Sequence, residues 1–285
     1  REIPIVVDLD ADILAVPTDK EPVGHYAGAK AGLHGLLSGA ACVTVSTQTL
    51  AHRLEREMPG LRGRLMVREN RLSDRLWRAA PPERKPDGFV RALFMGTPTH
   101  DEDLALVLDA AGQVAAQDAR FRLALVGVTG RSGTPGTGDD GVPDWIERWE
   151  IPDQARDYPA FVPWLRRRVA TVDFGLAPLA PTDFNASKSG LKMLDYGGLG
   201  LPVLASDASA YAELGRIAPG VTLVRDRDDK PSDAWRRALT ARIERERDLR
   251  HDGARLRAWV CAEAFLGQTL AAHDAWLCSL IQRQG

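Results

Sequence analysis

Short runs rich in Val, Leu and Ala alternate along this chain with longer segments in which apolar residues recur every three or four positions. Strands bury short apolar runs and helices bury one face, so the alternation predicts βαβ units with a parallel sheet. The expected strands are residues 3–7, 42–46, 65–67, 91–96, 121–127, 172–178, 202–206 and 221–224. The sequence therefore predicts an α/β protein, and at about 150 residues per domain its 285 residues indicate roughly two domains.

A polar, proline-containing break at residues 80–88 marks the expected domain boundary. We expect residues 1–80 to end an N-terminal domain and residues 81–285 to form a C-terminal domain. Helices are expected at 24–39, 47–58 and 101–118, the last starting with a capping box of Thr99 and Glu102. Two long terminal helices should follow, separated by the sequence HDG at 251–253.

Charge and cysteine content exclude several classes of protein. With 37 Lys plus Arg against 39 Asp plus Glu, the net charge of −2 does not indicate a nucleic-acid binder. Three scattered cysteines form no disulfide framework or metal motif, which predicts a cytoplasmic protein. No apolar run is long enough for a membrane span, and the first residues lack the charged-then-apolar pattern of a signal peptide. The chain enters a strand-like run without an initiating Met, so we expect a part of a longer protein.

A glycine-rich segment follows one expected strand at residues 127–141. It lacks the GK[ST] of a phosphate-binding loop, and Asp139 and Asp140 would repel phosphate. We interpret it as a surface loop, with a lid as the alternative.

The densest group of polar residues lies at 184–207, directly after the strand at 172–178. Ligands of open parallel sheets bind at such carboxyl ends. Lys188 and Lys192 are two of only six lysines, and a helix starting near Ser187 would place both on one face, close to free backbone N–H groups. This arrangement suits a diphosphate, and Asp195 could accept hydrogen bonds from ribose hydroxyls. A solvated helix face is the alternative.

These residues resemble the GT-B glycosyltransferases of family 4, which retain anomeric configuration and use nucleotide sugars. The likeness lies in the segment DFGLAPLAPTDFNASKSGLKMLDY and in the series Asp195, Gly200, Pro202, Val203, Ser206 and Asp207. It extends to VTVSTQTLAHRL, ENRLSDRLW, FMGTPTHDEDL and YPAFVPWL, and is similar to a bacterial subset often encoded with surface-polysaccharide genes.

The resemblance implies a Rossmann-like donor domain, preceded by the remnant of a second Rossmann-like domain that binds the acceptor. The terminal helices would cross back onto this remnant. The second acid of the family motif, which holds the donor ribose, falls on Asp195. The first acid is replaced by Ser187, so Asp183 or Asn185 could substitute for it.

The basic pair that this family usually carries after the first donor-domain strand is also replaced, by Gly96, Thr97 and a nearby His100. Phosphate binding is then expected to rest on Lys188, Ser189 and Lys192, with His100 as an additional donor. The expected catalytic residues are Ser187, Lys188 and Asp183. The expected donor-binding residues are Gly96, Thr97, His100, Asn185, Lys188, Ser189, Lys192 and Asp195.

The implied reaction is metal-independent transfer of a hexose from a nucleoside diphosphate sugar to a glycan or lipid-linked acceptor in surface polysaccharide synthesis. The nucleotide sugar is a co-substrate, and no cofactor and no nucleic acid are expected. The resemblance allows peripheral membrane association at the inner face through a missing N-terminal part. Two alternatives keep the fold: a nucleotide-sugar-binding scaffold without transfer activity, and a nucleotide-sugar epimerase.

One competing motif remains. Asp8 and Asp10 follow an apolar run with the DxD spacing that binds a divalent metal in GT-A glycosyltransferases. The sequence that follows does not resemble a GT-A glycosyltransferase, so we interpret these two acids as residues at the end of a strand, at the boundary between two domains.

Overall fold

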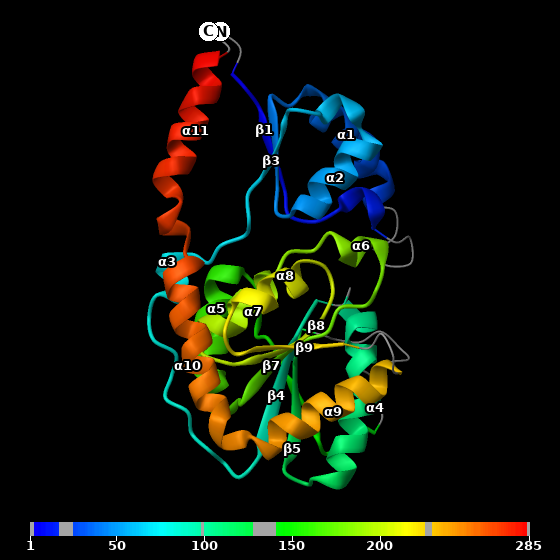
Figure 1. The fold of residues 1–285 in the computed structure, drawn as a ribbon, viewed down its shortest axis with the longest axis vertical. Helices are drawn as coiled ribbons and strands as arrows, with labels where there is room; N and C mark the ends of the chain where they lie inside the picture. Colours follow the sequence, from blue (N-terminus) through cyan, green and yellow to red (C-terminus); the bar gives the residue numbers. More distant parts are fainter. Residues whose placement is uncertain (1–2, 17–24, 98–99, 128–140, 226–229, 284–285) are drawn as a thin grey trace.

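The computed structural model describes residues 3–16, 25–97, 100–127, 141–225 and 230–283. Within these residues the strands form two separate sheets, one of three strands and one of six, and all neighbouring strands are parallel. The small sheet lies at one end of the elongated molecule, and the large sheet lies at the other (Figure 1). The prediction of an α/β protein with parallel strands is confirmed.

The small sheet has the order β1-β2-β3. Its strands are β1 (Val6–Leu9), β2 (Cys42–Val45) and β3 (Leu65–Val67). Two helices pack on it, α1 (His25–Gly39) and α2 (Gln48–Glu57), and apolar residues of both fill one core with those of the strands. The Thr47 hydroxyl accepts a hydrogen bond from Leu50 N at 3.1 Å and caps the start of α2. Short 3₁₀ turns occur at Ile13–Ala15 and Pro59–Leu61.

The large sheet has the order β6-β5-β4-β7-β8-β9. Its strands are β4 (Val90–Met95), β5 (Phe121–Val126), β6 (Ile146–Trp149), β7 (Phe174–Ala177), β8 (Val203–Ser206) and β9 (Val221–Val224). The chain builds outward from β4 to β6 and then returns to place β7 on the other side of β4. Ligands of open parallel sheets bind at such a reversal, outside the carboxyl ends of the strands.

Helices cover both faces of the large sheet. One face packs against α4 (Asp101–Gln117) and α9 (Pro231–Glu244). The other packs against α5 (Tyr158–Arg168), α7 (Leu191–Gly198), α8 (Ser209–Ile217) and α10 (Glu246–Glu263). Because neither face meets solvent, every residue of β4 is buried.

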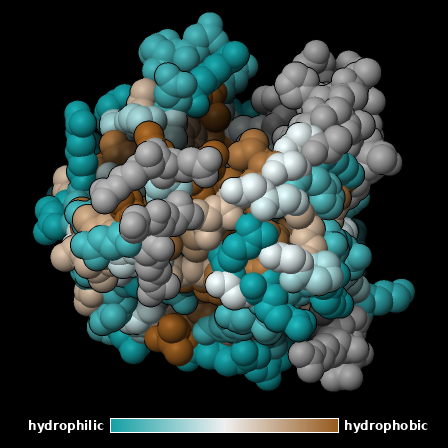
Figure 2. All heavy atoms as spheres, turned by 90° about the horizontal axis from the view of Figure 1, so that it is seen from above, coloured by the Kyte–Doolittle hydropathy of each residue, from teal (hydrophilic) through white to brown (hydrophobic). Residues whose placement is uncertain are grey.

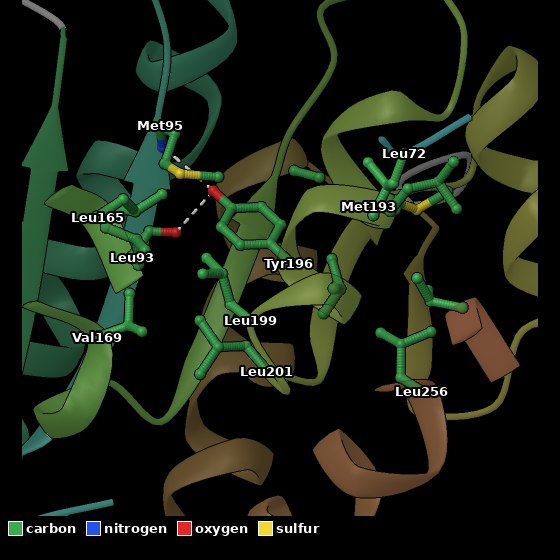
Figure 3. Close-up of a cluster of buried hydrophobic side chains, with 14 of the residues drawn as sticks. Leu72, Leu93, Met95, Leu165, Val169, Met193, Tyr196, Leu199, Leu201 and Leu256 are labelled. Carbon is green, nitrogen blue, oxygen red and sulfur yellow. Dashed lines mark hydrogen bonds between the residues drawn. The ribbon is translucent and has the colours of Figure 1, made fainter. Parts of the chain in front are cut away.

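Tyr196 ties helix α7 to the middle of this sheet. Its hydroxyl accepts a hydrogen bond from Met95 N at 3.1 Å and lies 2.9 Å from the carbonyl oxygen of Leu93 (Figure 3). It also lies 2.9 Å from the carbonyl oxygen of Leu176. A side chain at Gly175 would overlap the Tyr196 ring, so this strand position requires glycine. Close packing of the Tyr196 ring on Gly175 therefore holds the polar residues of α7 in a fixed position relative to β7.

Residues 68–89 connect the two sheets and pack against helix α10 of the large-sheet half. This connection includes α3 (Asp74–Trp77), and Arg257 of α10 donates hydrogen bonds to the carbonyl oxygens of Trp77, Arg78 and Ala79. After α10, a 3₁₀ turn at Leu266–Gln268 leads into α11 (Leu270–Arg283), which lies beside the small sheet (Figure 1). Within the described residues, the chain thus leaves the small sheet, forms the large one and ends beside the small one again.

Three details differ from the sequence-based expectations. The strand β6 was not predicted, because its residues Ile146–Trp149 mix charged and apolar side chains at the sheet edge. The helix expected near Ser187 begins at Leu191, after the short helix α6 (Asp183–Ala186). Glycine at 253 lies inside α10, where it allows the helix to contact the carbonyl of Gly200, so HDG does not separate two helices.

Some expectations fall on other parts of the chain. Residues 128–140 of the glycine-rich segment and Thr99 of the capping box lie outside the described residues, and the N-cap of α4 is His100. Two 3₁₀ turns, at Asp153–Ala155 and Val169–Thr171, flank α5.

Hydrophobic residues lie among hydrophilic ones on the face seen from above (Figure 2). Within the described ranges, none of the helices combines the length and apolarity needed to cross a membrane.

Candidate functional site

A cavity of about 1160 Å³ opens at the carboxyl ends of β4, β5 and β6, where the chain reverses toward β7. Its wall includes Asp10 and Ala11, which follow β1 of the small sheet, so residues next to both sheets contribute. The large-sheet part of the wall comprises Met95, Gly96, Thr97, His100, Val126, Gly127, Trp149, Glu150, Ile151, Arg156, Tyr158, Phe161, Lys188, Ser189, Leu191, Lys192, Asp195 and Tyr211.

Two glycines form adjacent parts of this wall. Gly127 has φ of 77°, and a Cβ there would lie 2.5 Å from the carbonyl oxygen of Gly96. L residues with side chains rarely adopt this conformation, so the close approach of the strand ends depends on glycine. The absence of side chains leaves backbone as the cavity surface after β4 and β5.

Lys192 lies in the first turn of α7 and is part of the cavity wall. Its Nζ lies 5.0 Å from the centre of the Phe94 ring and has no hydrogen-bond partner in the described part of the chain. Burial lowers the pKa of Lys192 to about 8, partly opposed by Asp103 and Asp195. An anion in the cavity would supply the hydrogen-bond acceptor that this ammonium lacks.

Lys188 precedes α7, in the turn after α6. Its Nζ lies 3.8 Å from Asp103 Oδ2 and 5.0 Å from the centre of the Phe184 ring, and its side chain is 15% exposed. The two lysines therefore do not share one helix face as predicted, although both line the same cavity. The first amides of α7 also lack partners within the helix, as at any helix start.

His100 is held by the carboxylate of Asp103, with 2.6 Å between His100 Nδ1 and Asp103 Oδ2. Burial lowers the pKa of His100 to about 4, a shift that Asp103 opposes and Lys192 and Lys188 reinforce. The ring is then neutral at pH 7 and donates Nδ1–H to Asp103, which leaves Nε2 as an acceptor. This geometry does not support the expected role of His100 as a phosphate donor.

Asp103 is the centre of a buried network behind the cavity wall. It accepts hydrogen bonds from Ala180 N at 2.7 Å and from Asn185 Nδ2 at 2.8 Å, in addition to His100. Burial raises its pKa, but the hydrogen bonds from His100 and Ala180 and the charge of Lys188 outweigh burial, so the pKa of Asp103 lies below its ordinary value. The carboxylate thus stays charged and fixes the segments that carry His100 and Lys188.

Asp195 lies one turn after Lys192 on α7 and faces the same cavity. Its Oδ1 accepts a hydrogen bond from the Tyr158 hydroxyl at 2.9 Å, and that hydroxyl accepts one from Trp77 Nε1 at 3.2 Å. Burial raises the pKa of Asp195 to about 7, against the lowering effects of Tyr158 and Lys192. In the described residues Oδ2 of Asp195 receives no hydrogen bond, so it is available to a ligand hydroxyl.

Hydrogen bonds also join the two halves of the molecule beside the cavity. Asn70 Nδ2 donates to Ser189 Oγ at 2.9 Å, and Thr47 Oγ1 donates to the carbonyl oxygen of Ser187 at 3.0 Å. The loop before α7 is therefore held from the side of the small sheet as well.

The structure brings together most of the donor-site residues expected from the sequence. Seven of them line the cavity: Gly96, Thr97, His100, Lys188, Ser189, Lys192 and Asp195.

Three expected residues do not line it. Asn185 is buried and directs its amide toward Asp103 and Ala180. Ser187 is fully buried, and its hydroxyl has no partner in the described residues. Asp183 has a side chain that is 92% exposed, 3.9 Å from Arg53. The geometry therefore gives no support to Ser187 or Asp183 as catalytic groups.

Sequence reasoning assigned no role to several residues of the site. Asp103 follows His100 by three positions at a helix start, a spacing that could have indicated their contact. Tyr158 lies 37 residues before its partner Asp195, so no local pattern could have paired them. Trp149 comes from the unpredicted strand β6.

The two acids of the possible metal motif, Asp8 and Asp10, have different surroundings. Asp8 accepts a hydrogen bond from the Thr44 hydroxyl, whereas Asp10 lines the cavity. Among the described residues, no group of three or more His, Cys, Asp or Glu side chains is placed to hold a metal ion.

No family model and no curated protein matches the sequence. Solved structures do match the fold. Anabaena Alr3699/HepE in complex with UDP and glucose aligns with a TM-score of 0.66 and 13% identity, over 97% of this chain and 72% of that one. Sucrose-phosphate synthase from Thermosynechococcus elongatus aligns with a TM-score of 0.67 and 14% identity, over 98% and 68%.

A third match is a glycosyltransferase from Rickettsia africae, with a TM-score of 0.63 and 11% identity over 97% of this chain and 70% of that one. At such low identity the likeness concerns the fold. The arrangement of two Rossmann-like parallel sheets with a cavity beside their facing ends is the GT-B fold of these glycosyltransferases.

Proposed function

We propose that this protein binds the nucleoside diphosphate of a sugar nucleotide in the cavity and transfers the sugar to an acceptor. The observation that carries the proposal is the buried Lys192 ammonium, which has no hydrogen-bond partner in the described residues, together with Lys188 and the start of α7. A diphosphate would accept hydrogen bonds from all three. Asp195, one turn further, offers a carboxylate oxygen to the ribose hydroxyls.

The proposed chemistry follows from where charge develops. As the bond between sugar and diphosphate breaks, negative charge grows on the leaving phosphate and positive charge on the sugar. Fixed cations at the phosphate stabilise this transition state more than the ground state. Lys188 and Lys192 can fill that role, so we propose transfer without a metal. The transfer of a hexose with retention is part of the proposal because the sequence resembles the family 4 glycosyltransferases. A glycan or lipid-linked acceptor in surface polysaccharide synthesis at the cytoplasmic face remains part of this proposal.

A second candidate function is nucleotide-sugar binding without transfer. It is favoured by the position of Ser187, which stands where the resembled family has its first acid and which is buried away from the cavity. In the described wall, the carboxylates besides Asp195 are Asp10 and Glu150. A scaffold would need the phosphate and ribose contacts but no further acid.

The test is a thermal-shift and calorimetric screen with UDP, GDP, ADP, CDP and dTDP sugars, followed by product analysis with and without glycan acceptors. A transferase turns over only with an acceptor, an epimerase alters the nucleotide sugar without one, and a scaffold binds it unchanged. Lys192→Ala should reduce binding of the best ligand about tenfold or more. Binding of no nucleotide by the wild-type protein would contradict the proposal.

A further inference from the structure

Tyr158 connects Asp195, the acid that we propose to bind ribose, to the segment that joins the two sheets. Its hydroxyl donates to Asp195 Oδ1 at 2.9 Å and accepts from Trp77 Nε1 at 3.2 Å. The three residues come from α5, α7 and α3, which lie far apart in the sequence. A continuous hydrogen-bond chain therefore runs from the connection to the cavity.

The far end of this chain is fixed. Trp77 is 1% exposed, and its ring packs so closely on Gly198 of α7 that a Cβ there would lie 2.5 Å from it. Arg257 donates to the Trp77 carbonyl oxygen at 2.6 Å. With both backbone and ring held, the indole N–H has one direction, and it orients the Tyr158 hydroxyl so that its own hydrogen points to Asp195.

We propose that Tyr158 is a positioning residue, which holds the Asp195 carboxylate with Oδ2 turned to accept hydrogen bonds from the vicinal hydroxyls of the donor ribose. This inference rests on the proposed function. Tyr158 lines the cavity and is 43% exposed, so it could lose its hydroxyl without a large packing defect. Its effect on a ligand would act through Asp195.

The charge state of Asp195 provides a second readout. The titratable groups that face it are Tyr158 from α5, Tyr211 from α8, and Lys192 and Tyr196 from α7 itself. Burial raises the pKa of Asp195 to about 7, and the Tyr158 hydrogen bond is the largest influence that lowers it. Ribose binding needs the ionised carboxylate, so it should weaken as pH falls through this pKa, and loss of the hydroxyl should move that decline to higher pH.

The experiment compares Tyr158→Phe with the wild type by calorimetry, using UDP with 2′-deoxy-UDP and GDP with 2′-deoxy-GDP over pH 5.5 to 9. We expect the variant to bind the ribonucleotide about three- to tenfold more weakly and the deoxynucleotide less than about twofold more weakly. The pH of half-maximal ribonucleotide binding should rise. Tyr196→Phe is the matched control, because it removes a buried tyrosine hydroxyl that contacts only backbone groups of the described chain.

The control should lower the melting temperature but leave ribose preference and pH midpoint unchanged. If Tyr158→Phe keeps the wild-type preference and midpoint, the positioning role is overturned while the proposed function stands. If the wild-type protein binds UDP or GDP without preferring ribose, the inference also fails. If it binds dTDP alone among these nucleotides, the inference fails while the proposed function stands. If it binds none of UDP, GDP, ADP, CDP and dTDP, the proposed function fails together with the inference.

Discussion

The ammonium of Lys192 lies 5.0 Å from the centre of the Phe94 ring, at the end of the strand that starts the large sheet. A ring face attracts a cation but accepts no conventional hydrogen bond, so this contact only partly replaces the water lost on burial. The unliganded protein thus carries a charge at a cost that an anionic ligand would offset. Stability and binding should respond in opposite directions when this charge is removed.

Lys192→Met should stabilise the unliganded protein by about 1–3 kcal/mol at pH 7, because an apolar side chain of similar length avoids the desolvation of the ammonium. The same variant should lose diphosphate binding. Urea unfolding at several pH values measures the first effect. The folded pKa of about 8 lies below the ordinary lysine pKa of 10.5, so the wild-type stability should rise between these pH values, and that of the variant should not.

Lys85→Met is the control, since Lys85 has an exposed side chain in the connection between the sheets. It should change neither stability nor binding measurably. A wild-type protein more stable than Lys192→Met at pH 7 would contradict the claim that the desolvation of this ammonium outweighs its favourable contacts.

Two substitutions should separate the phosphate and ribose parts of the site. Lys188→Ala removes a cation beside the expected diphosphate, and Asp195→Ala removes an acceptor for ribose hydroxyls. Each should weaken nucleoside diphosphate binding about tenfold or more. A nucleoside without phosphates should respond to Asp195→Ala and hardly to Lys188→Ala.

Calorimetry at two salt concentrations completes this comparison. Added salt should weaken diphosphate binding more in the wild type than in Lys188→Ala, because screening acts on the charge that the variant lacks. Equal and negligible effects of Lys188→Ala and Lys85→Ala would indicate a solvated surface instead of a phosphate site.

Much of the architecture follows from the apolar pattern. β4, β5, β7 and β8 are buried on both faces and therefore appear as short continuous apolar runs, which locates them in the sequence. β6 lies at the sheet edge, where its residues Ile146–Trp149 are mostly half-buried, so the pattern weakens and the strand was missed.

The site was predictable to the extent that it is local. Lys192 and Asp195 are three positions apart on one helix, and helical periodicity alone brings them to the same side. Asn185, in contrast, does not line the cavity, because its amide donates a hydrogen bond to the buried carboxylate of Asp103, 82 positions away. Such pairings are decided by tertiary packing, and no spacing in the sequence encodes them.

The acidity of Asp195 should appear in the stability of the unliganded protein. Its folded pKa of about 7 lies above the ordinary aspartate pKa of 3.8, so the folded state binds the proton more tightly, and stability falls as pH rises from about 4 to 7. Asp195→Asn keeps an oxygen for the Tyr158 hydroxyl but cannot ionise. Thermal unfolding should show similar stability at pH 4 and a variant more stable than the wild type by about 1–3 kcal/mol at pH 8. Parallel stability curves across this range would contradict the burial of a titrating carboxylate.

Gly253 tests the packing of α10 on the large sheet. A Cβ at this position would overlap the carbonyl of Gly200 and approach Pro202 Cδ to 3.0 Å, and backbone cannot move aside as a side chain can. Gly253→Ala should therefore destabilise the protein by about 1–3 kcal/mol or more, despite the better helix propensity of alanine. Gly35→Ala is the control, because a Cβ at this position in α1 meets nothing within 4 Å. Urea unfolding measures the stability of both variants. A Gly253→Ala variant more stable than the wild type would show that α10 does not contact the backbone at Gly200.

Chelation tests whether the lysines replace a metal at the diphosphate. Because Lys188 and Lys192 supply fixed positive charge next to the start of α7, we expect nucleoside diphosphate affinity to change less than about twofold when EDTA is added. Asp8→Ala, which removes the acceptor of the Thr44 hydroxyl, should likewise leave this affinity unchanged. The measurement is calorimetric titration with and without EDTA, and then with Mn²⁺ restored. Binding that is lost with EDTA, recovered with Mn²⁺ and absent in Asp8→Ala or Asp10→Ala would instead assign the diphosphate to a metal held by these two acids.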